Sequence, residues 1–405
     1  MNYEFPVITH IDEIVNVIKD SKEFIVAERE WGYVVNYLVA GPDTFPSINV
    51  TSSSQKSRDE GIKASTIRRE CRGMIFGKDG RLISRPFHKF FNVNERDETR
   101  ADKIDLEQRH VILEKLDGSM IRAIPMFNGT YRLATKMGIT DVSVQAEGFV
   151  SARPNYDQFF RETLKQGYTA LFEWCSRQQR IVIDYPEDRL VLLAMRDNHS
   201  GSYLPVGMLR ELAVDYNLDL VREYPGTASS MEQLLEETCE LKGQEGWIIR
   251  FNDGHMLKLK GSEYVTIHKA KDRILRENGV IGMILDEKTD DVKPFLPKDD
   301  RCALERYEGE FWQGVNDTAG RWQLAYADVK SQFGADRKGF ALDWAPKFES
   351  NLRGAIFKAW DDPQFDFRAA VIDAVRKNLG TQARVNEARH LWGDARWQIS
   401  CIGEE

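Results

Sequence analysis

Lys115 stands at a point where an apolar run ends and a turn begins. Residues 111–113 form the apolar run, which is typical of a buried strand, and Asp117-Gly118 is a pair typical of turns. We expect Gly118 to give the turn its backbone freedom, because glycine adopts a positive φ without steric cost. An amine held at such a point can attack a phosphorus atom and carry a nucleotide as a phosphoramide. A surface hairpin has a similar composition, so this chemistry needs support from other segments.

Two further lysines share one face of a predicted strand. Lys258 and Lys260 alternate with Leu257 and Leu259, and side chains two positions apart in a strand point to the same side. The two ammonium groups repel each other unless an anion lies between them. A phosphate group would fill that place, and a solvated strand face is the alternative.

Glu173 is a carboxylate inside an apolar run. It lies between Phe172 and Trp174, in a segment with the composition of a half-buried strand. A buried carboxylate needs a hydrogen-bonding or charged partner. The hydroxyl groups of a ribose could be that partner, and a structural salt bridge is the alternative.

Length, composition and charge exclude several classes of protein. The chain has 405 residues, too many for one ordinary core, which indicates two or three domains. It is 42% hydrophobic and 30% charged. No apolar run approaches the roughly 18 residues of a membrane helix. The net charge of −8 argues against a protein that coats nucleic acid, because such proteins carry basic stripes, and leaves room only for local contacts.

The cysteines and the start of the chain bear on location. The five cysteines are scattered and include no CxxC pair, which disfavours both a disulfide framework and a zinc site. The first residues lack the basic and apolar blocks of a signal peptide. We therefore expect a cytoplasmic protein without membrane association.

The pattern of elements predicts an α+β fold. Strand-like runs dominate residues 111–260, helical stretches interrupt them near 143–165 and 206–240, and antiparallel sheets are the expected arrangement. The predicted strands include 180–183. The polar residues 49–66 are expected to form a loop.

The C-terminal third has a different character. From about residue 262 onward the apolar residues recur at helical spacing. We therefore place a domain boundary after residue 268. The predicted domains are 1–268, which is rich in strands, and 269–405, which is helical.

The segments described above resemble, in their order, the motif set of the covalent nucleotidyltransferases, which include nucleic-acid ligases and messenger-RNA capping enzymes. Residues 115–118 are similar to the nucleophile motif and 172–174 to the ribose-binding motif. Residues 245–246 are similar to a carboxylate motif linked to metal, and 258–260 to the final phosphate-binding motif.

A finer resemblance is to the bacteriophage RNA ligase 1 family of the T4 type, and it covers roughly residues 25–270. The segments that carry it are 70–73, 84–86, 89–92, 180–182 and 258–260. The helical C-terminal region resembles that family only in being helical.

The resemblance implies a fold and a set of roles. The fold is an antiparallel-sheet nucleotidyltransferase domain, similar to the ATP-grasp-like ligases, followed by an all-helical domain that could confer RNA or tRNA specificity. The implied catalytic residues are Lys115, Lys258, Lys260 and Glu245. The implied nucleotide-binding residues are Tyr37, Arg72, Lys89, Glu114, Asp117, Gly118, Lys136, Glu173, Lys258 and Lys260. The implied metal-binding residues are Glu245, Asp290 and Asp291.

The implied activity is that of an ATP-dependent RNA ligase. It would join 5′-phosphate and 3′-hydroxyl ends of single-stranded RNA or cleaved tRNA through a lysyl-AMP and an RNA-adenylate. ATP is the implied substrate and Mg²⁺ or Mn²⁺ the implied metal, and a monomer in the host cytoplasm is expected. We also expect three neighbouring cations, Lys258, Lys260 and a bound metal, to disfavour the charged form of Lys115 and so favour the nucleophilic amine.

Two alternatives remain open. One is another covalent nucleotidyltransferase, either a DNA ligase or a capping-type enzyme. The other is a non-catalytic protein that binds RNA ends.

Overall fold

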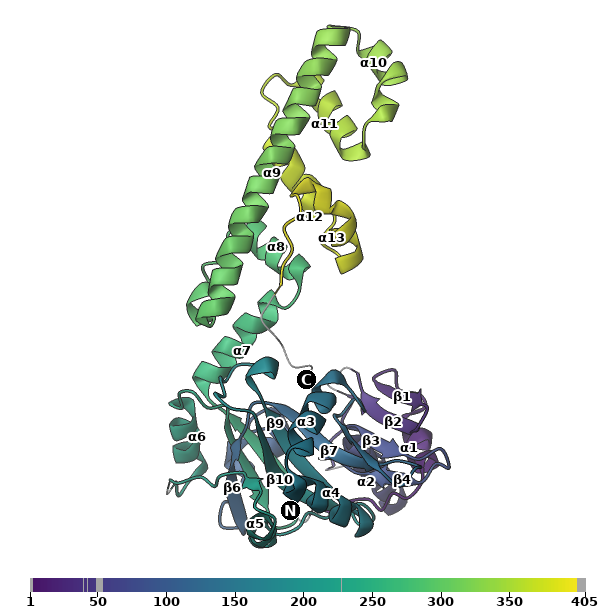
Figure 1. Cartoon of the computed structure of the whole chain (residues 1–405), viewed down its shortest axis with the longest axis vertical. Coiled ribbons are helices and arrows are strands. Elements are labelled where there is room, and N and C mark those ends of the chain that lie inside the picture. The colour runs from purple at the N-terminus through teal and green to yellow at the C-terminus, as the bar shows by residue number, and fades with distance from the viewer. Residues whose placement is uncertain (1–2, 39, 42, 49–53, 227, 399–405) are drawn as a thin grey trace. The chain divides into compact units, whose positions relative to one another are not determined.

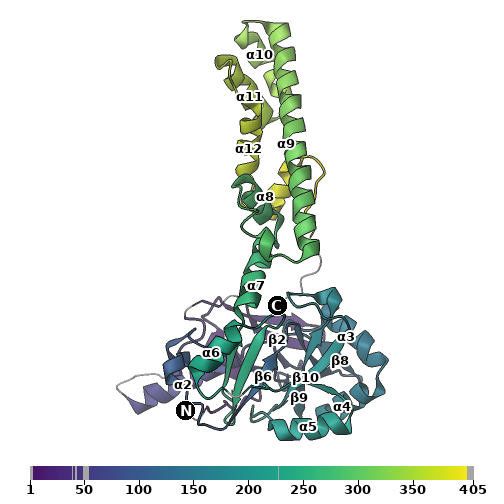
Figure 2. The ribbon, with the colours of Figure 1, turned by 90° about the vertical axis from the view of Figure 1, so that its left-hand side faces the viewer.

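The computed structural model describes residues 3–38, 40–41, 43–48, 54–226 and 228–398. The chain forms two compact units that divide between Val265 and Thr266. The sequence placed the boundary between residues 268 and 269. The strands lie in the first unit, and Figures 1 and 2 show the elements of both.

Three sheets build the first unit. The first has the order β1-β2-β3-β4 and consists of β1 (Phe24–Arg29), β2 (Gly32–Tyr37), β3 (Met74–Phe76) and β4 (Leu82–Ser84). The second has the order β11-β10-β9-β7-β8 and consists of β7 (Ser119–Pro125), β8 (Tyr131–Ala134), β9 (Tyr168–Cys175), β10 (Arg189–Asp197) and β11 (Asp219–Leu220). The third has the order β5-β13-β12-β6 and consists of β5 (Phe91–Asn92), β6 (His110–Lys115), β12 (Gly246–Phe251) and β13 (Met256–Lys260).

Most neighbouring strands in these sheets are antiparallel. The exceptions are two short edge strands, because β11 runs parallel to β10 and β5 runs parallel to β13. The predicted α+β class, with a strand-rich part followed by a helical part, is confirmed.

One face of the second sheet is packed against helix α4, so the side chains that alternate with the packed ones must point to its other face. The rings of Phe159 and Phe160 on α4 (Pro154–Lys165) lie 5.9 and 5.0 Å from the ring of Phe172 on β9. Successive residues of a strand point to opposite faces. Since Phe172 is buried under this helix, its neighbour Glu173 must point to the other face of the sheet.

The other helices of the first unit are α1 (Ile11–Ile18), α2 (Gln55–Glu70), α3 (Asp141–Ser151), α5 (Val206–Asp215) and α6 (Met231–Cys239). Short 3₁₀ turns are η1 (Asp97–Thr99), η2 (Ala101–Lys103) and η3 (Arg177–Gln179).

Helix α2 corrects the predicted loop at residues 49–66, of which 49–53 lie outside the described residues. Ser54 caps the helix, because its side chain accepts a hydrogen bond from the backbone N–H of Ser57. Only the last turns of α2 are buried, around Ile67 and Glu70. The exposed first turns carry no apolar stripe, so their composition resembled that of a loop.

The predicted strand at 180–183 is also wrong. These residues follow η3 and belong to no strand. The backbone N–H groups of Val182 and Ile183 donate instead to the carboxylate of Asp117, at 2.7 Å each. A long-range side-chain partner therefore replaces the ladder that the apolar run suggested.

The second unit is helical in its described part, as the sequence predicted. Its helices, with α7 spanning the division, are α7 (Ser262–Ile274), α8 (Glu277–Leu285), α9 (Lys298–Phe333), α10 (Arg337–Asp343), α11 (Ser350–Asp361), α12 (Phe367–Arg376) and α13 (Gln382–Ala388). Its 3₁₀ turns are η4 (Lys293–Phe295), η5 (Ala345–Lys347) and η6 (Arg389–Leu391).

The long helix α9 organises this unit, with α11 and α12 packed along it (Figure 2). Leu304, Phe311 and Val315 on α9 are fully buried in one cluster with Val371 and Val375 of α12. None of the helices in the described ranges combines the length and the apolar character that crossing a bilayer requires.

Candidate active site

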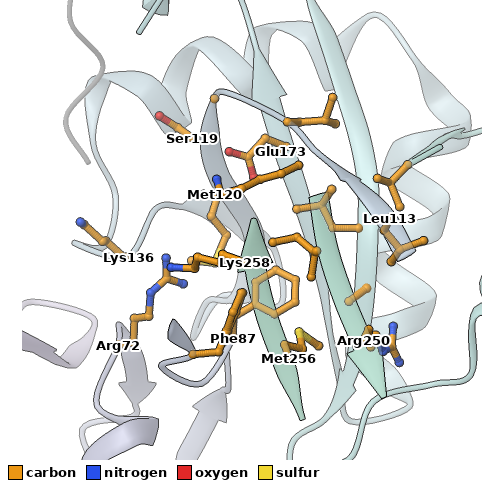
Figure 3. A pocket seen from close by; sticks show the side chains of 18 of the residues that line it. Arg72, Phe87, Leu113, Ser119, Met120, Lys136, Glu173, Arg250, Met256 and Lys258 are labelled. Carbon is orange, nitrogen blue, oxygen red and sulfur yellow. The ribbon is translucent and has the colours of Figure 1, made fainter. Parts of the chain in front are cut away.

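A pocket of about 300 Å³ lies between side chains of the second and third sheets (Figure 3). Ten of the predicted residues line it: Tyr37, Arg72, Lys89, Glu114, Lys115, Gly118, Lys136, Glu173, Lys258 and Lys260. Arg72, Lys136 and Lys258 gather on one side, while the apolar side chains of Phe87 and Met256 lie at another (Figure 3). The pocket thus has a cationic side and a more apolar side.

Lys115 ends β6 and forms a buried ion pair. Its Nζ lies 2.6 Å from Oε1 of Glu245, whose side chain is only 2% exposed. Burial alone would lower the pKa of Lys115, but the attraction and hydrogen bond of Glu245 outweigh it and raise the pKa above its usual value. Lys258 and Lys260 alone therefore do not lower the pKa of Lys115, because the nearest charge is an anion.

The turn after Lys115 is held by Asp117. The Asp117 carboxylate accepts hydrogen bonds from the 182–183 backbone and from the hydroxyl of Tyr264 at 2.7 Å, and its own backbone N–H donates to the Tyr185 hydroxyl at 3.0 Å. Asp117 is 3% exposed. In this structure Asp117 shapes the lysine turn, whereas the sequence predicted a nucleotide contact.

Tyr185 and Tyr264 were not predicted. They contact the lysine turn from positions far along the chain, and no local pattern marks either of them.

Gly118 serves the turn for a different reason than the sequence suggested. Its φ is not in the left-handed region. A Cβ atom there would lie 2.3 Å from the carbonyl oxygen of Trp174 on β9. The glycine is therefore required because the turn crosses the strand that carries Glu173 at very close range.

Glu173 faces the pocket, as the strand alternation requires. Among the residues that the structure describes, no hydrogen bond or ion pair reaches its carboxylate, so the salt-bridge alternative is not realised. Burial, aided by Glu245 and Asp117 and opposed by Lys115, raises the pKa of Glu173 to about 8. This carboxyl group is a half-buried hydrogen-bonding group that lacks a protein partner.

The two lysines of β13 point to one side, as predicted, but they differ in charge balance. Lys260 lies 3.1 Å from Glu245 and 5.2 Å from the ring centroid of Tyr264. Lys258 has no carboxylate partner within the described part of the chain, and its Nζ lies 4.8 Å from the ring centroid of Phe90. Burial and the cations around it, beginning with Arg72, hold the pKa of Lys258 well below its usual range.

A third lysine of the pocket is held by aromatic rings. The Nζ of Lys89 lies 5.2 Å from the ring centroid of Tyr37 and 5.4 Å from those of Phe45 and Phe91. Burial raises the pKa of Tyr37, but the cations of Arg72, Lys89 and Lys136 outweigh burial and lower it. The positive charge on this side of the pocket therefore outweighs the effect of burial on Tyr37, and it would also attract a phosphate group.

Three predicted acidic residues differ from this pattern: Glu114 lines the pocket but has a charged partner in the protein, and Asp290 and Asp291 do not line the pocket. The carboxylate of Glu114 pairs with Arg222, at 2.8 Å to each oxygen, which satisfies it within the protein. Asp290 and Asp291 lie exposed in the second unit, and Asp290 pairs with Lys293 at 2.9 Å. Within the described ranges no three metal-binding side chains cluster. The metal role of the two aspartates stays a prediction.

Glu245 could hold a divalent cation through a single carboxylate. Mg²⁺ is usually bound by one or two carboxylates together with phosphate oxygens and waters, so a dense cluster is not required. A carboxylate oxygen is the kind of ligand that suits such a hard cation, which would compete for it with the ammonium groups 2.6 and 3.1 Å away.

Comparisons with known proteins agree with this arrangement. A model of the T4-type RNA ligase family matches residues 70–290, which is more than half of the chain. A candidate RNA ligase of Thermovibrio ammonificans is 27% identical over 291 residues, covering 70% of each chain. RNA ligase 1 of bacteriophage TS2126 is 28% identical over 193 residues, covering 45% of this chain and 47% of its own.

Among solved structures, an archaeal ATP-dependent RNA ligase aligns with a TM-score of 0.43 and 16% identity over 64% of each chain. A score of this size does not decide the fold, which rests on the topology described above. The strand-rich unit and its lysine pocket define an enzyme of the nucleotidyltransferase superfamily. The chain belongs to the T4-type RNA ligase family.

Replacing Glu173 by glutamine should change how stability depends on pH. The native carboxyl group has its pKa raised from 4.5 to about 8, so the native state holds this proton more tightly than the unfolded chain. The contribution of Glu173 to stability is therefore fully present below the unfolded value and is lost as pH rises toward the native value. Glu173→Gln removes this loss, and it should gain on the order of 2–4 kcal/mol relative to wild type between pH 5 and pH 9.

Urea denaturation of both proteins at the two pH values measures this difference. Glu211→Gln, at an exposed position of the first unit, is the matched control. An equal pH response of Glu173→Gln and wild type would contradict the protonated state of Glu173.

Proposed function

We propose that this enzyme joins RNA 5′-phosphate and 3′-hydroxyl ends at the expense of ATP, through a covalent lysyl-AMP on Lys115. The observation that carries the proposal is the placement of Lys115. Its amine lies at the end of a strand, on the wall of a pocket that also contains Glu173 and Lys258, neither of which forms an ion pair with any residue that the structure describes. A nucleotide has the ribose hydroxyls and the phosphates that these two groups lack.

In the first step the amine of Lys115 attacks the α-phosphorus of ATP. A nitrogen–phosphorus bond forms, the bond from phosphorus to the bridging oxygen breaks, and pyrophosphate leaves. The amine must first lose its proton to solvent, because Glu245, 2.6 Å away, is the carboxylate that would hold the metal. A bound divalent cation would neutralise phosphate charge and polarise the α-phosphate.

Lys258 is suited to stabilise the charge that develops on the α-phosphate. Neighbouring cations penalise its own charge until an anion arrives, so the arrival of phosphate relieves a repulsion that is already present. Glu173 would accept hydrogen bonds from the ribose. Arg72 and Lys89 would hold the ribose or the β- and γ-phosphates, with Tyr37 beside them.

In the second step an oxygen of the RNA 5′-phosphate attacks the same phosphorus. The nitrogen–phosphorus bond breaks, Lys115 regains its proton, and an RNA-adenylate results. In the third step the 3′-hydroxyl of another end attacks the 5′-phosphate, and AMP leaves with the oxygen that linked it. Lys136 is a cation of the pocket that would bind the nucleotide and also serve these RNA steps.

The two units would then act as two domains. The first would carry nucleotide chemistry, and the second would confer preference for an RNA such as a cleaved tRNA. Monomeric state and cytoplasmic location stay predictions. Adduct formation with labelled ATP but not labelled GTP separates this proposal from a capping-type enzyme. Formation of any adduct would exclude a non-catalytic RNA-end-binding protein. Comparing the ligation of RNA ends with that of DNA ends would distinguish the proposed enzyme from a DNA ligase.

Lys115→Ala should abolish formation of the AMP–protein adduct. No other amine is presented by the turn after β6, so no residue can take over the attack. Mass spectrometry after incubation with ATP and Mg²⁺ measures the adduct. Lys103→Ala, which removes a surface lysine paired with Asp97, should keep it. A full adduct on Lys115→Ala would refute the assignment of the nucleophile.

Lys258→Ala and Lys260→Ala should each slow adenylation. The loss of one charge-stabilising group raises the barrier by roughly 2–4 kcal/mol. Single-turnover adenylation with labelled ATP measures the rate. Rates within about threefold of wild type would mean that the α-phosphate does not contact these lysines.

A further inference from the structure

Arg122 on β7 is a fully buried cation that does not line the pocket. Its three hydrogen-bond acceptors are neutral: Ser84 Oγ at 2.8 Å, the Thr135 carbonyl oxygen at 3.1 Å and the Gly73 carbonyl oxygen. No carboxylate pairs with its guanidinium anywhere in the described segments. Burial, together with the cation of Arg72, lowers the pKa of Arg122 to about 9.

Packing does not account for this charge. Taking a cation out of water is unfavourable unless an anion neutralises it, and an apolar side chain of similar volume would fill the same space without that penalty. The deeply buried Arg85 and Arg196 of the same unit both pair with Glu70, at 3.0 and 2.7 Å. Arg122 differs from them because its described partners are carbonyl and hydroxyl groups. The reason for its buried charge must therefore lie in where those partners are placed.

The two carbonyl partners adjoin two cations of the pocket. Gly73 follows Arg72, Thr135 precedes Lys136, and both of these cationic residues line the pocket. The two segments also touch directly, because a Cβ atom on Gly73 would lie 2.6 Å from the carbonyl oxygen of Lys136 and 2.8 Å from its Cα. Arg122 therefore links, through hydrogen bonds to their backbone, the two segments whose Arg72 and Lys136 side chains line the cationic side of the pocket.

We propose that Arg122 is a positioning residue that fixes the spacing between the Arg72 and Lys136 side chains where the phosphates of the nucleotide bind. This inference rests on the proposed function. A guanidinium group is planar and presents several N–H donors in fixed directions, so it reaches two carbonyl groups at once. A lysine ammonium keeps the charge but is a point on a flexible stem, so it cannot hold both segments in the same way.

The test compares two different ways of disturbing one contact. Arg122→Lys keeps the charge and removes the planar fork, while Gly73→Ala pushes the same two segments apart and leaves the Arg122 side chain itself unchanged. Both should lower kcat/KM for ATP in adduct formation by about 10- to 100-fold, the scale expected when binding groups move by about an ångström. Arg196→Lys is the matched control, because it removes an equally buried guanidinium that binds the carbonyl groups of Gly201 and Pro86. Its effect on kcat/KM should be smaller, whatever it does to the unfolding midpoint.

A double-mutant cycle separates positioning from general destabilisation. In a Lys136→Ala background, Arg122→Lys should lose much less activity than in wild type, because one of the two groups that it positions is gone. Equal losses in both backgrounds, or an Arg122→Lys enzyme within about threefold of wild type, would overturn the inference. If wild type forms no adduct with ATP, the proposed function fails instead, so the two failures are distinguishable.

Discussion

Three strand ends of the first unit meet at one buried carboxylate, that of Glu245. It lies just before β12, and it binds Lys115 at the end of β6 and Lys260 at the end of β13, at 2.6 and 3.1 Å. The register of the sheet explains this meeting, because Gly246 is paired with Lys115 on one side and with Lys260 on the other. Gly246 has a φ of +151°, and a Cβ atom there would lie against the Leu259 carbonyl oxygen. Only glycine lets the strands approach closely enough for one carboxylate to hold both ammonium groups.

Around this carboxylate, the charges of the pocket do not balance. Glu245 neutralises part of the charge of Lys115 and Lys260, but Lys258 lies beside the Phe90 ring, pairs with no carboxylate in the described part of the chain and has a strongly lowered pKa. Glu173 is in the opposite position, since it is a carboxyl group with a raised pKa and no protein hydrogen bond among the described residues. Each group is unfavourably placed in the protein alone. A molecule that brings phosphate to one and hydroxyl groups to the other would remove both penalties, and the proposed nucleotide has both kinds of group.

Short-range patterns in the sequence predicted much of this, and long-range contacts explain what they missed. The spacing of Lys258 and Lys260 predicted that both side chains lie on one face of their strand. Phe172 and Glu173 are neighbours in a strand, so they lie on opposite faces, because the side-chain direction in a strand repeats every two residues. Helix α2 was missed because its exposed turns bury nothing. Tyr185 reaches the lysine turn from 68 positions away in the sequence and Tyr264 from 147. The contacts of Arg122 could not be predicted either. Its carbonyl acceptors are 49 and 13 positions away in the sequence, and a backbone carbonyl group is not marked by any residue type. Such contacts exist only once the sheets have assembled.

The pKa of Lys115 is raised in the structure, although the lysines near it were expected to lower it. Counting nearby cations predicted a lowered pKa, but the interaction of two charges depends on their separation, and the nearest charge is an anion at 2.6 Å. The same carboxylate is the one on which the resemblance places the metal. A cation that binds Glu245 would therefore weaken its hold on Lys115 and add positive charge beside the amine. Both changes lower the pKa of Lys115, so the expected activation belongs to the metal- and nucleotide-bound site. In the protein alone, the ion pair keeps Lys115, the proposed nucleophile, protonated and holds its amine beside Glu245.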